Sequence, residues 1–355
     1  MNDQSKNLET VGVIGAGSFG TAVSNLLALN TKVILYSRRS EIARAINEER
    51  FRYGVPIHDR VEATNDLSLV TSSCQLLFVF VPSDAFRTVM QQMASLLNPS
   101  HLIVHGTKGL DVTQLTETDY RQIEKVNREQ IHVMSSVIKQ ETSVVRVGIM
   151  SGPNLARELL DGQPTATLIA SKFQEVIERA KEVLKSEQLH VFGSYDLLGA
   201  ELAGALKNVI ALGSGILKGF GLGKNIQAML ITRGLHEMVQ LGQYFGSDAT
   251  AFFGTAGIGD LIATATSKKS RNFLFGFRLG KGETLDEVLS TNVELAEGVR
   301  TLALVNGLSL AHRLRLPICQ TLFRVVYQDF DMDSAMKYLI TYPYDVDVAF
   351  STNSN

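Results

Sequence analysis

A glycine-rich turn near the start of the chain constrains the fold more than any other feature. The segment VGVIGAGSFG places Gly15, Gly17 and Gly20 in the spacing G-x-G-x-x-G, after an apolar run and before a helical pattern. The first glycine allows a tight turn, the second lets the backbone approach a pyrophosphate, and the third lets the helix pack closely on the strand. N–H groups at the start of such a helix face the phosphates. The segment predicts a dinucleotide-binding turn, and the alternative is a glycine-rich loop without a ligand.

The first half of the chain alternates short β-rich runs with helical patterns. The predicted strands are near-continuous apolar runs, which is typical of strands buried on both faces of a sheet. They are Val11–Ile14, Lys32–Tyr36, Leu76–Val81, Leu102–His105, Val147–Ser151, Ala166–Ser171 and His190–Phe192. The predicted helices between them are Thr21–Leu29, Ser40–Glu49, Asp84–Leu97 and Gln174–Ser186. This alternation predicts a Rossmann-type α/β domain with a doubly wound parallel sheet.

The pattern changes after about Ser194, where strand-like runs end. Helical spacing follows, at Ala200–Leu217, Asn225–Tyr244, Leu285–Leu289 and Glu297–Arg313. We therefore predict a dinucleotide-binding domain at 1–194 and an all-α substrate and catalytic domain at 195–355, which suits a chain of 355 residues. The polar stretch 111–140 is expected to be an insertion or a surface helix. The tail after about residue 335 is assigned no function.

The composition excludes several classes of function. Thirty-four Lys and Arg against 36 Asp and Glu give a net charge of −2, so no overall field attracts nucleic acid. Two cysteines, Cys74 and Cys319, cannot form a disulfide framework and fit a reducing cytoplasm. The seven histidines lack metal-ligand spacing, so we expect no metal. His105, near a strand end, is the one histidine that we single out as a candidate for function. Glycines interrupt the apolar stretch 11–29, and no later apolar run is expected to reach its length, so we expect no membrane insertion.

The end of the second predicted strand bears on the choice of cofactor. An acidic residue for a ribose 2′-hydroxyl is expected about 20 residues after the glycines, but this region reads Ser37, Arg38 and Arg39. No carboxylate is present to repel a 2′-phosphate, and Arg38 can pair with one. The pattern favours NADP, with NAD tolerated. The alternative is a pair of solvated surface arginines.

Two lysines lie in sequence contexts that suit ligand binding or proton transfer. Lys108 lies between Gly106 and Gly109 after a predicted strand, where ligands collect in open α/β sheets. Lys207 lies in an apolar helical stretch, with small residues such as Gly204 on the same face. Desolvation there would lower the pKa of the lysine toward the range useful for proton transfer. The alternatives are a surface turn for Lys108 and a lysine that extends from a buried helix to solvent for Lys207.

A second glycine-rich stretch, GTAGIGD, leads into Asp260, and Ser270, Arg271 and Asn272 follow. Ser270 is expected to cap a helix whose N–H groups bind an anion beside the Arg271 guanidinium. A solvated turn or a nucleic-acid patch is the alternative. The near-neutral charge and the lack of interleaved aromatic residues disfavour nucleic acid.

Taken in order, these motifs resemble those of the NAD(P)-dependent glycerol-3-phosphate dehydrogenase family. The resemblance covers roughly residues 11–317. It rests on GAGSFGTA, VPSDAFR, HGTKGL, SGPNLARE, GAELAGALKNVIALGSGI, GLGKNIQAMLITRGLHEM, GTAGIGDLIAT, SRN and EGVRT. It implies a cytoplasmic homodimer that uses NAD(P)H to reduce dihydroxyacetone phosphate, a small phosphorylated substrate, to sn-glycerol 3-phosphate for phospholipid synthesis.

The resemblance also implies roles for individual residues. Lys207 looks like the proton donor to the carbonyl oxygen, Lys108 like a contact to both cofactor and substrate, and Asp260 like a hydrogen-bonding partner of the reacting centre. The residues expected to bind substrate are Lys108, Gly152, Asn154, Ala156, Lys207, Asp260, Ser270, Arg271 and Asn272. Those expected to bind cofactor are Gly15, Gly17, Ser18, Phe19, Gly20, Arg38, Lys108, Arg271, Leu295 and Glu297. Family members often carry Trp in place of Phe19, and Ser or Thr in place of Asn154.

Two other functions remain open at this point. One is a reductase of the same architecture that acts on another small anionic hydroxy acid. The other is a dinucleotide-sensing protein without turnover. The presence of Lys207 and Asp260 argues against a sensor, since a sensor needs no proton donor.

Overall fold

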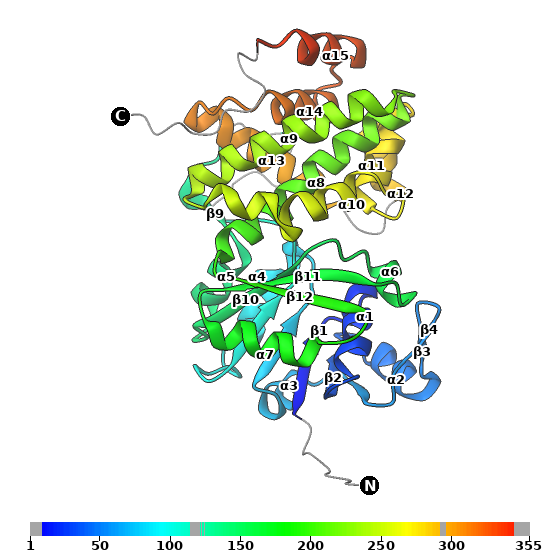
Figure 1. The fold of residues 1–355 in the computed structure, drawn as a ribbon, viewed down its shortest axis with the longest axis vertical. Coiled ribbons are helices and arrows are strands. Elements are labelled where there is room, and N and C mark those ends of the chain that lie inside the picture. The colour runs from blue at the N-terminus through cyan, green and yellow to red at the C-terminus, as the bar shows by residue number, and fades with distance from the viewer. Residues whose placement is uncertain (1–8, 114–120, 122, 124, 292–295, 344–355) are drawn as a thin grey trace.

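The computed structural model describes residues 9–113, 121, 123, 125–291 and 296–343, and Figure 1 shows an α/β half below a helical half. The last strand of the sheet ends at Ser194, and the first long helix of the helical half begins at Leu197. The helical half has its own cluster of buried apolar residues, separate from those that cover the sheet. We keep the domain division into 1–194 and 195–355 as a proposal.

An eight-stranded sheet forms the centre of the α/β half. Its strands are β1 (Thr10–Ile14), β2 (Lys32–Tyr36), β5 (Val61–Thr64), β6 (Leu76–Val79), β7 (Leu102–His105), β10 (Arg146–Ser151), β11 (Thr165–Ser171) and β12 (Leu189–Ser194), in the spatial order β12-β11-β10-β7-β6-β1-β2-β5. Helices cover the sheet: α1 (Ser18–Leu27), α2 (Ser40–Glu49), α3 (Leu67–Ser73), α4 (Ser83–Met93), α5 (Met134–Glu141), α6 (Ala156–Leu160) and α7 (Gln174–Leu184). The prediction of a Rossmann-type α/β domain is confirmed.

The sheet is parallel as predicted, except at one pair of strands. β10 and β11 run antiparallel, with Gly148 opposite Ser171. The connection between them contains only α6, a five-residue helix about 7.5 Å long. A parallel return would have to carry the chain back along β10, which is about 20 Å long. The connection therefore contains no helix long enough to cover the length of the strand, which fits the antiparallel direction.

Several elements escaped sequence analysis because they lack a continuous apolar run. β5 lies at the edge of the sheet, so its residues alternate between buried and exposed. A hairpin of two short strands, β3 (Phe51–Arg52) and β4 (Val55–Pro56), lies between α2 and β5 in the chain. Short strands of this kind carry too few residues for a periodic pattern.

The described residues of the stretch 111–140 do not form a surface helix. It contains the paired strands β8 (Asp111–Val112) and β9 (Ile131–His132) and the start of α5, whose apolar side chains are buried against α4 and β10. Ile123 and Val126 pack into the helical half, where Gly307 leaves room for both. Residues 114–120, 122 and 124 lie outside the described part of the chain. The segment thus links the two halves.

The helical half is built around α8 (Leu197–Gly219), most of whose residues are buried. The surrounding helices are α9 (Lys224–Phe245), α10 (Asp260–Ala265), α11 (Arg271–Gly280), α12 (Leu285–Thr291), α13 (Glu297–His312), α14 (Pro317–Tyr327) and α15 (Met332–Thr341). Glycines let α8 and α11 approach closely: a Cβ on Gly276 would lie 2.0 Å from the Leu212 carbonyl oxygen, and one on Gly215 would lie 2.0 Å from that of Phe273. The prediction of an all-α C-terminal half is confirmed.

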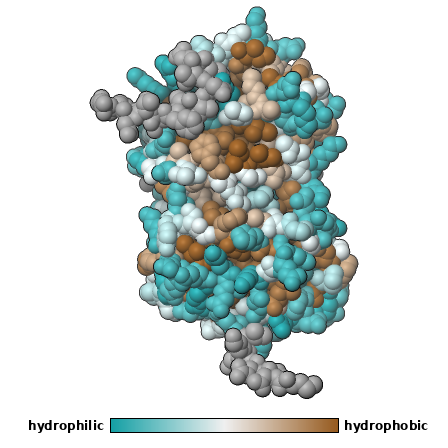
Figure 2. Space-filling model, viewed as in Figure 1, coloured by the Kyte–Doolittle hydropathy of each residue, from teal (hydrophilic) through white to brown (hydrophobic). Residues whose placement is uncertain are grey.

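The expectation that no later apolar run matches the length of 11–29 is wrong for α8. Within the described ranges, α8 is the helix that is long and apolar enough to cross a membrane, but its most apolar window is fully buried in the protein. It is therefore a core helix, as in a soluble protein. The face of the molecule in Figure 2 is mostly hydrophilic, with separate apolar patches, which fits this interpretation.

Candidate active site

A buried carboxylate joins two lysines at the junction of the two halves. Asp260, at the start of α10, accepts a hydrogen bond from Lys207 Nζ at 2.5 Å on one oxygen and from Lys108 Nζ at 2.6 Å on the other. Asp260 is 1% exposed and Lys207 is 5% exposed. The structure therefore brings together the three residues that the sequence selected for catalysis.

Each member of this cluster comes from a different element. Lys207 lies near the middle of α8, and Lys108 lies in the loop after β7, at the carboxyl end of the sheet. A π-helical turn, Thr255–Gly259, leads directly into Asp260, and a Cβ on Gly257 would lie 2.1 Å from the Phe252 carbonyl oxygen. This part of the glycine-rich stretch therefore allows the close backbone approach that places the carboxylate.

Burial and charge set the protonation of the cluster. Burial lowers the pKa of Lys207 to about 7; the Asp260 carboxylate opposes this effect and the Lys108 ammonium adds to it. Burial by itself would raise the pKa of Asp260, but the ammonium groups of Lys108 and Lys207 hold that pKa below its usual range. Asp260 is therefore ionised at neutral pH. An amine with a pKa near neutrality can give up or take a proton under physiological conditions.

Two further side chains belong to the cluster and escaped sequence analysis. Thr264 accepts a hydrogen bond from Lys207 Nζ at 2.6 Å, and its hydroxyl donates to Asp260 at 3.1 Å. Asn208 donates to the Lys108 carbonyl oxygen at 3.0 Å. The four-residue spacing between Asp260 and Thr264 in a helical segment was the available signal for the first. Asn208 offered no signal apart from following Lys207.

The predicted dinucleotide turn lies between β1 and α1. Gly15 adopts φ +115°, and a Cβ on Gly20 would lie 1.9 Å from the Gly15 carbonyl oxygen, so both positions require glycine. A Cβ on Gly17 would meet no atom within 4 Å, which leaves its exposed backbone open to a ligand. Ser18 is also exposed, and the Phe19 ring packs edge-on against Phe80 with centroids 4.9 Å apart. These residues fit a bound pyrophosphate.

The other predicted cofactor residues are spread more widely. Arg38 is exposed just after β2. Glu297, at the start of α13, accepts hydrogen bonds from the Ser83 backbone N–H at 3.0 Å and from the Ser83 hydroxyl at 2.5 Å. A Cβ on Gly109 would lie 2.6 Å from the same carboxylate, so that glycine leaves space for it. Leu295 lies outside the described residues.

The segment Ser270–Asn272 begins α11. The Ser270 hydroxyl caps the helix by accepting the Phe273 N–H at 3.3 Å, and Arg271 is exposed. The buried Asn272 side chain donates to Asn208 at 3.0 Å and accepts the Gly298 N–H at 2.8 Å. The amide of Asn272 is thus engaged within the protein, whereas Arg271 faces outward.

Of the three predicted substrate residues after β10, one contacts Lys108. The Gly152 carbonyl oxygen accepts a hydrogen bond from Lys108 Nζ at 3.0 Å. Asn154 is buried; its amide donates to Ala166 at 3.2 Å and accepts from Thr167 at 2.8 Å, so both of its polar atoms bind the neighbouring strand. Ala156 is the first residue of α6. Only Gly152 contacts the lysine cluster directly.

His105 takes part in a buried contact of its own. Its Nε2 lies 3.0 Å from Glu201 of α8, and Glu201 also accepts the Ser135 N–H at 2.7 Å and hydroxyl at 2.6 Å. The carboxylate therefore ties β7 and the start of α5 to the helix that carries Lys207. In the part of the chain that the structure describes, no group of His, Cys, Asp and Glu is placed to hold a metal ion.

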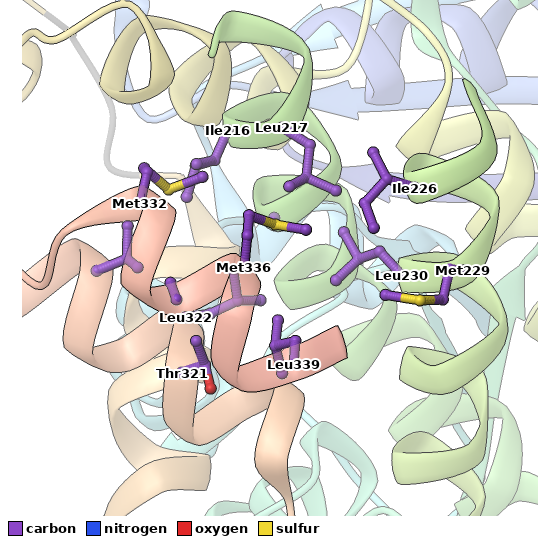
Figure 3. A pocket seen from close by; sticks show the side chains of 13 residues that line it. Ile216, Leu217, Ile226, Met229, Leu230, Thr321, Leu322, Met332, Met336 and Leu339 are labelled. Atoms are coloured by element: carbon purple, nitrogen blue, oxygen red, sulfur yellow. The ribbon is translucent and has the colours of Figure 1, made fainter. Parts of the chain in front are cut away.

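An apolar pocket in the helical half is separate from this cluster. Figure 3 shows residues of α8, α9, α14 and α15 around it, including Ile216, Leu230, Met332 and Met336. Its lining contains no ionisable side chain and none of the predicted site residues. The pocket therefore lacks the groups needed for proton transfer or for binding a phosphate.

A Rossmann-type sheet with a dinucleotide turn, joined to a helical half that carries a buried lysine and carboxylate, defines a two-domain nicotinamide-dependent dehydrogenase. The chain matches the family model for the NAD-dependent glycerol-3-phosphate dehydrogenase N-terminus over residues 10–177, and that for the C-terminus over residues 196–337. The chain belongs to the NAD-dependent glycerol-3-phosphate dehydrogenase family. The resemblance drawn from its motifs is confirmed.

Individual relatives agree with this assignment. The chain is 38% identical over 328 residues to a glycerol-3-phosphate dehydrogenase (NAD(P)+) of Halothermothrix orenii, covering 90% of this chain and 91% of the relative. It is 36% identical over 347 residues to one of Pseudomonas putida, covering 96% and 97%. The crystal structure of glycerol-3-phosphate dehydrogenase from Coxiella burnetii is similar at TM-score 0.83 and 30% identity, covering 94% and 99%.

Dehydrogenases of other specificity share the fold at greater distance. A ketopantoate reductase from Ralstonia eutropha has TM-score 0.53 at 17% identity, and a D-mandelate dehydrogenase has 0.58 at 13% identity. These likenesses extend to the fold alone. Because the relatives at 38% and 36% identity are glycerol-3-phosphate dehydrogenases, the alternative of a reductase for another hydroxy acid is not favoured.

Proposed function

We propose that this chain catalyses the reversible NAD(P)H-dependent reduction of dihydroxyacetone phosphate to sn-glycerol 3-phosphate, for phospholipid synthesis. The observation that carries the proposal is the buried contact of Lys207 and Lys108 with Asp260, at the carboxyl edge of a sheet with a dinucleotide turn. Membership of the family supports the same substrate. The bound nicotinamide supplies the hydride.

Lys207 is the proposed proton donor to the substrate carbonyl oxygen, and the acceptor in the reverse direction. Its pKa of about 7 lets it exchange that proton near neutral pH. Lys108 adds a positive charge that stabilises the developing alkoxide. Asp260 is a site residue that holds both ammonium groups in place, and Gly152 orients Lys108 through its carbonyl oxygen. Asn154 and Ala156 complete the proposed substrate side.

The phosphate of the substrate is proposed to bind at the start of α11. The Ser270 cap and the positive end of the helix dipole favour an anion there, and Arg271 offers a guanidinium. Asn272 supports this turn through its contacts with Asn208 and Gly298. The remote phosphate contact would orient the carbonyl for reaction. Arg271 is also proposed to contact the cofactor.

Replacing Arg271 with alanine is expected to raise KM for dihydroxyacetone phosphate by about 10- to 100-fold, because a charge-assisted hydrogen bond to the phosphate is lost. Steady-state kinetics at saturating cofactor measure the change. Lys268→Ala, which removes an exposed cation nearby, is the matched control. A fall in thermal stability with unchanged KM would show that Arg271 is structural.

The cofactor is proposed to be NADP or NAD, with NADPH favoured. The glycines of the turn, Ser18 and Phe19 would hold the parts common to both cofactors, and Glu297 would approach from the helical half. Leu295, which lies outside the described residues, stays a predicted cofactor contact. The preference rests on Arg38, which is exposed after β2 where a 2′-phosphate would lie.

Arg38→Ala is therefore expected to raise KM for NADPH about tenfold or more and to leave KM for NADH nearly unchanged. Initial rates with both cofactors give the comparison. Arg39→Ala is the control, because Arg39 is also exposed and lies 3.7 Å from Glu41. Equal losses for both cofactors would remove the NADPH assignment.

One assay tests the proposed reaction itself. Oxidation of NADPH and NADH is followed with dihydroxyacetone phosphate and, separately, with unphosphorylated dihydroxyacetone. We expect rapid oxidation with the phosphate and little with the free ketone, because the phosphate contributes the orienting contact. Absence of oxidation with the phosphate would contradict the proposed function and favour a sensor.

The assembly and location of the chain are further proposals. We propose a homodimer in the cytoplasm, where the buried free thiols of Cys74 and Cys319 would stay reduced. Light scattering on the purified chain tests the dimer, which predicts about twice the mass of one chain. A monomer at micromolar concentration would contradict it.

A further inference from the structure

The β3–β4 hairpin lies outside the dinucleotide turn and is held at both ends. At its tip, Tyr53 and Gly54 have φ values of +51° and +82°, as in a tight two-residue hairpin turn. Arg157 of α6 donates to the Tyr53 carbonyl oxygen at 3.2 Å. At the base, Asn25 of α1 donates to the Pro56 carbonyl oxygen at 2.9 Å. The hairpin is thus fixed to α1 and α6, which lie near it in Figure 1.

This arrangement holds one guanidinium at the glycine-rich turn. Arg52 Nε donates to the carbonyl oxygen of Ala16, between Gly15 and Gly17, at 3.4 Å. Its Nη2 lies 3.3 Å from the Tyr53 hydroxyl, and its Cζ lies 4.6 Å from the centroid of the Tyr53 ring. The contacts described for the guanidinium engage Nε and Nη2, and the remaining donors are available to a ligand.

The glycine-rich turn is also open to a ligand beside Arg52. The backbone of Gly17 is exposed, with no atom within 4 Å of its Cβ position. An anion on the turn would therefore lie against Gly17. Gly17 directly follows Ala16, and Arg52 contacts the carbonyl oxygen of Ala16. A planar guanidinium is suited to paired hydrogen bonds with phosphate oxygens.

We propose that Arg52 binds the pyrophosphate of the dinucleotide and that the hairpin is a fixed clamp on the cofactor. The proposal rests on the proposed function, because it requires a dinucleotide on the glycine-rich turn. It differs from the role of Arg38: the pyrophosphate is common to NADH and NADPH, so Arg52 contributes to affinity for both without selecting between them.

Direct binding measurements on the full chain test this proposal. Titration of NADH and NADPH with Arg52→Ala is expected to raise both dissociation constants by about tenfold. The affinity for ADP-ribose, which contains the pyrophosphate, should fall by the same factor, whereas adenosine, which has no phosphate, should bind as tightly as it does to the unaltered chain. Arg52→Lys is expected to recover part of the loss, since it keeps the charge without the planar fork.

Arg44→Ala, which removes an exposed arginine from α2, is the matched control and should leave all four affinities unchanged. Unaltered affinity of Arg52→Ala for NADH overturns the proposal, and so does a loss confined to NADPH or an equal loss for adenosine. If the unaltered chain itself fails to bind either dinucleotide, the proposed function fails instead. Should Arg52→Ala fold poorly, Arg52→Gln supplies the same comparison, because it keeps hydrogen-bonding capacity at the hairpin without the charge.

Discussion

Replacing Lys207 with alanine is expected to lower turnover by about 10²- to 10⁴-fold, the contribution typical of a positioned general acid. Lys207 is buried on α8, and its ammonium lies 2.5 Å from Asp260 and 2.6 Å from Thr264. No other described side chain shares both contacts, so nothing in the described site replaces the donor. Affinity for the dinucleotide should stay nearly unchanged, because the glycine-rich turn is intact.

The measurement for Lys207→Ala is a comparison of kcat with the dissociation constant for NADPH. Lys218→Ala is the matched control, because Lys218 lies on the same helix but is exposed. It should keep full turnover. Retained turnover in Lys207→Ala would refute the proton-donor assignment, whereas loss of cofactor binding would indicate a general collapse of the site.

The second large effect is expected from Asp260→Asn. The Asp260 carboxylate is ionised and contacts both amino groups, so its neutral replacement leaves the buried Lys207 and the partly buried Lys108 without their counter-charge. Breaking a buried ion pair in this way costs about 3–5 kcal/mol in the free energy of unfolding. The pKa of Lys207 should also fall further below about 7, because the group that opposes its desolvation is removed.

Two measurements check Asp260→Asn. Denaturant unfolding is expected to show the lost stability, and the pH at which reduction begins to fail should move to lower values. At neutral pH the reduction rate should drop by about tenfold for each unit of that shift. Asp333→Asn, at an exposed position of α15, is the control. An unchanged pH profile would show that Asp260 does not tune Lys207.

Much of the fold follows from local patterns. Strands such as β7 are buried on both faces, so their apolar runs identify them, and the glycine-rich turn lies in a recognisable strand and helix context. The antiparallel β10–β11 pair and the edge strand β5 do not follow from such patterns, because pairing direction and edge position depend on the whole sheet. The burial of Ile123 and Val126 in the helical half has the same long-range origin.

The candidate site likewise combines residues that local motifs identify with contacts that only the fold creates. Sequence motifs identified Lys108, Lys207 and Asp260 one by one, but their contacts span 53 and 152 residues of sequence, and only the fold brings them together. Thr264 joins the cluster through one helical turn, and Arg52 reaches the glycine-rich turn through a hairpin that carries no apolar pattern. Short polar elements of this kind acquire their role from tertiary position.

The pH dependence of a single turnover tests the proton-donor role most directly. Enzyme saturated with NADH and dihydroxyacetone phosphate is followed from about pH 5.5 to about pH 9, and the reverse reaction with sn-glycerol 3-phosphate is followed over the same range. Because the pKa of Lys207 is about 7 and the donor must be protonated, reduction should slow as the pH rises through about 7. Oxidation should accelerate over the same interval, because it requires the neutral amine. Reduction that is independent of pH, or that speeds up as the pH rises, would contradict the role of Lys207.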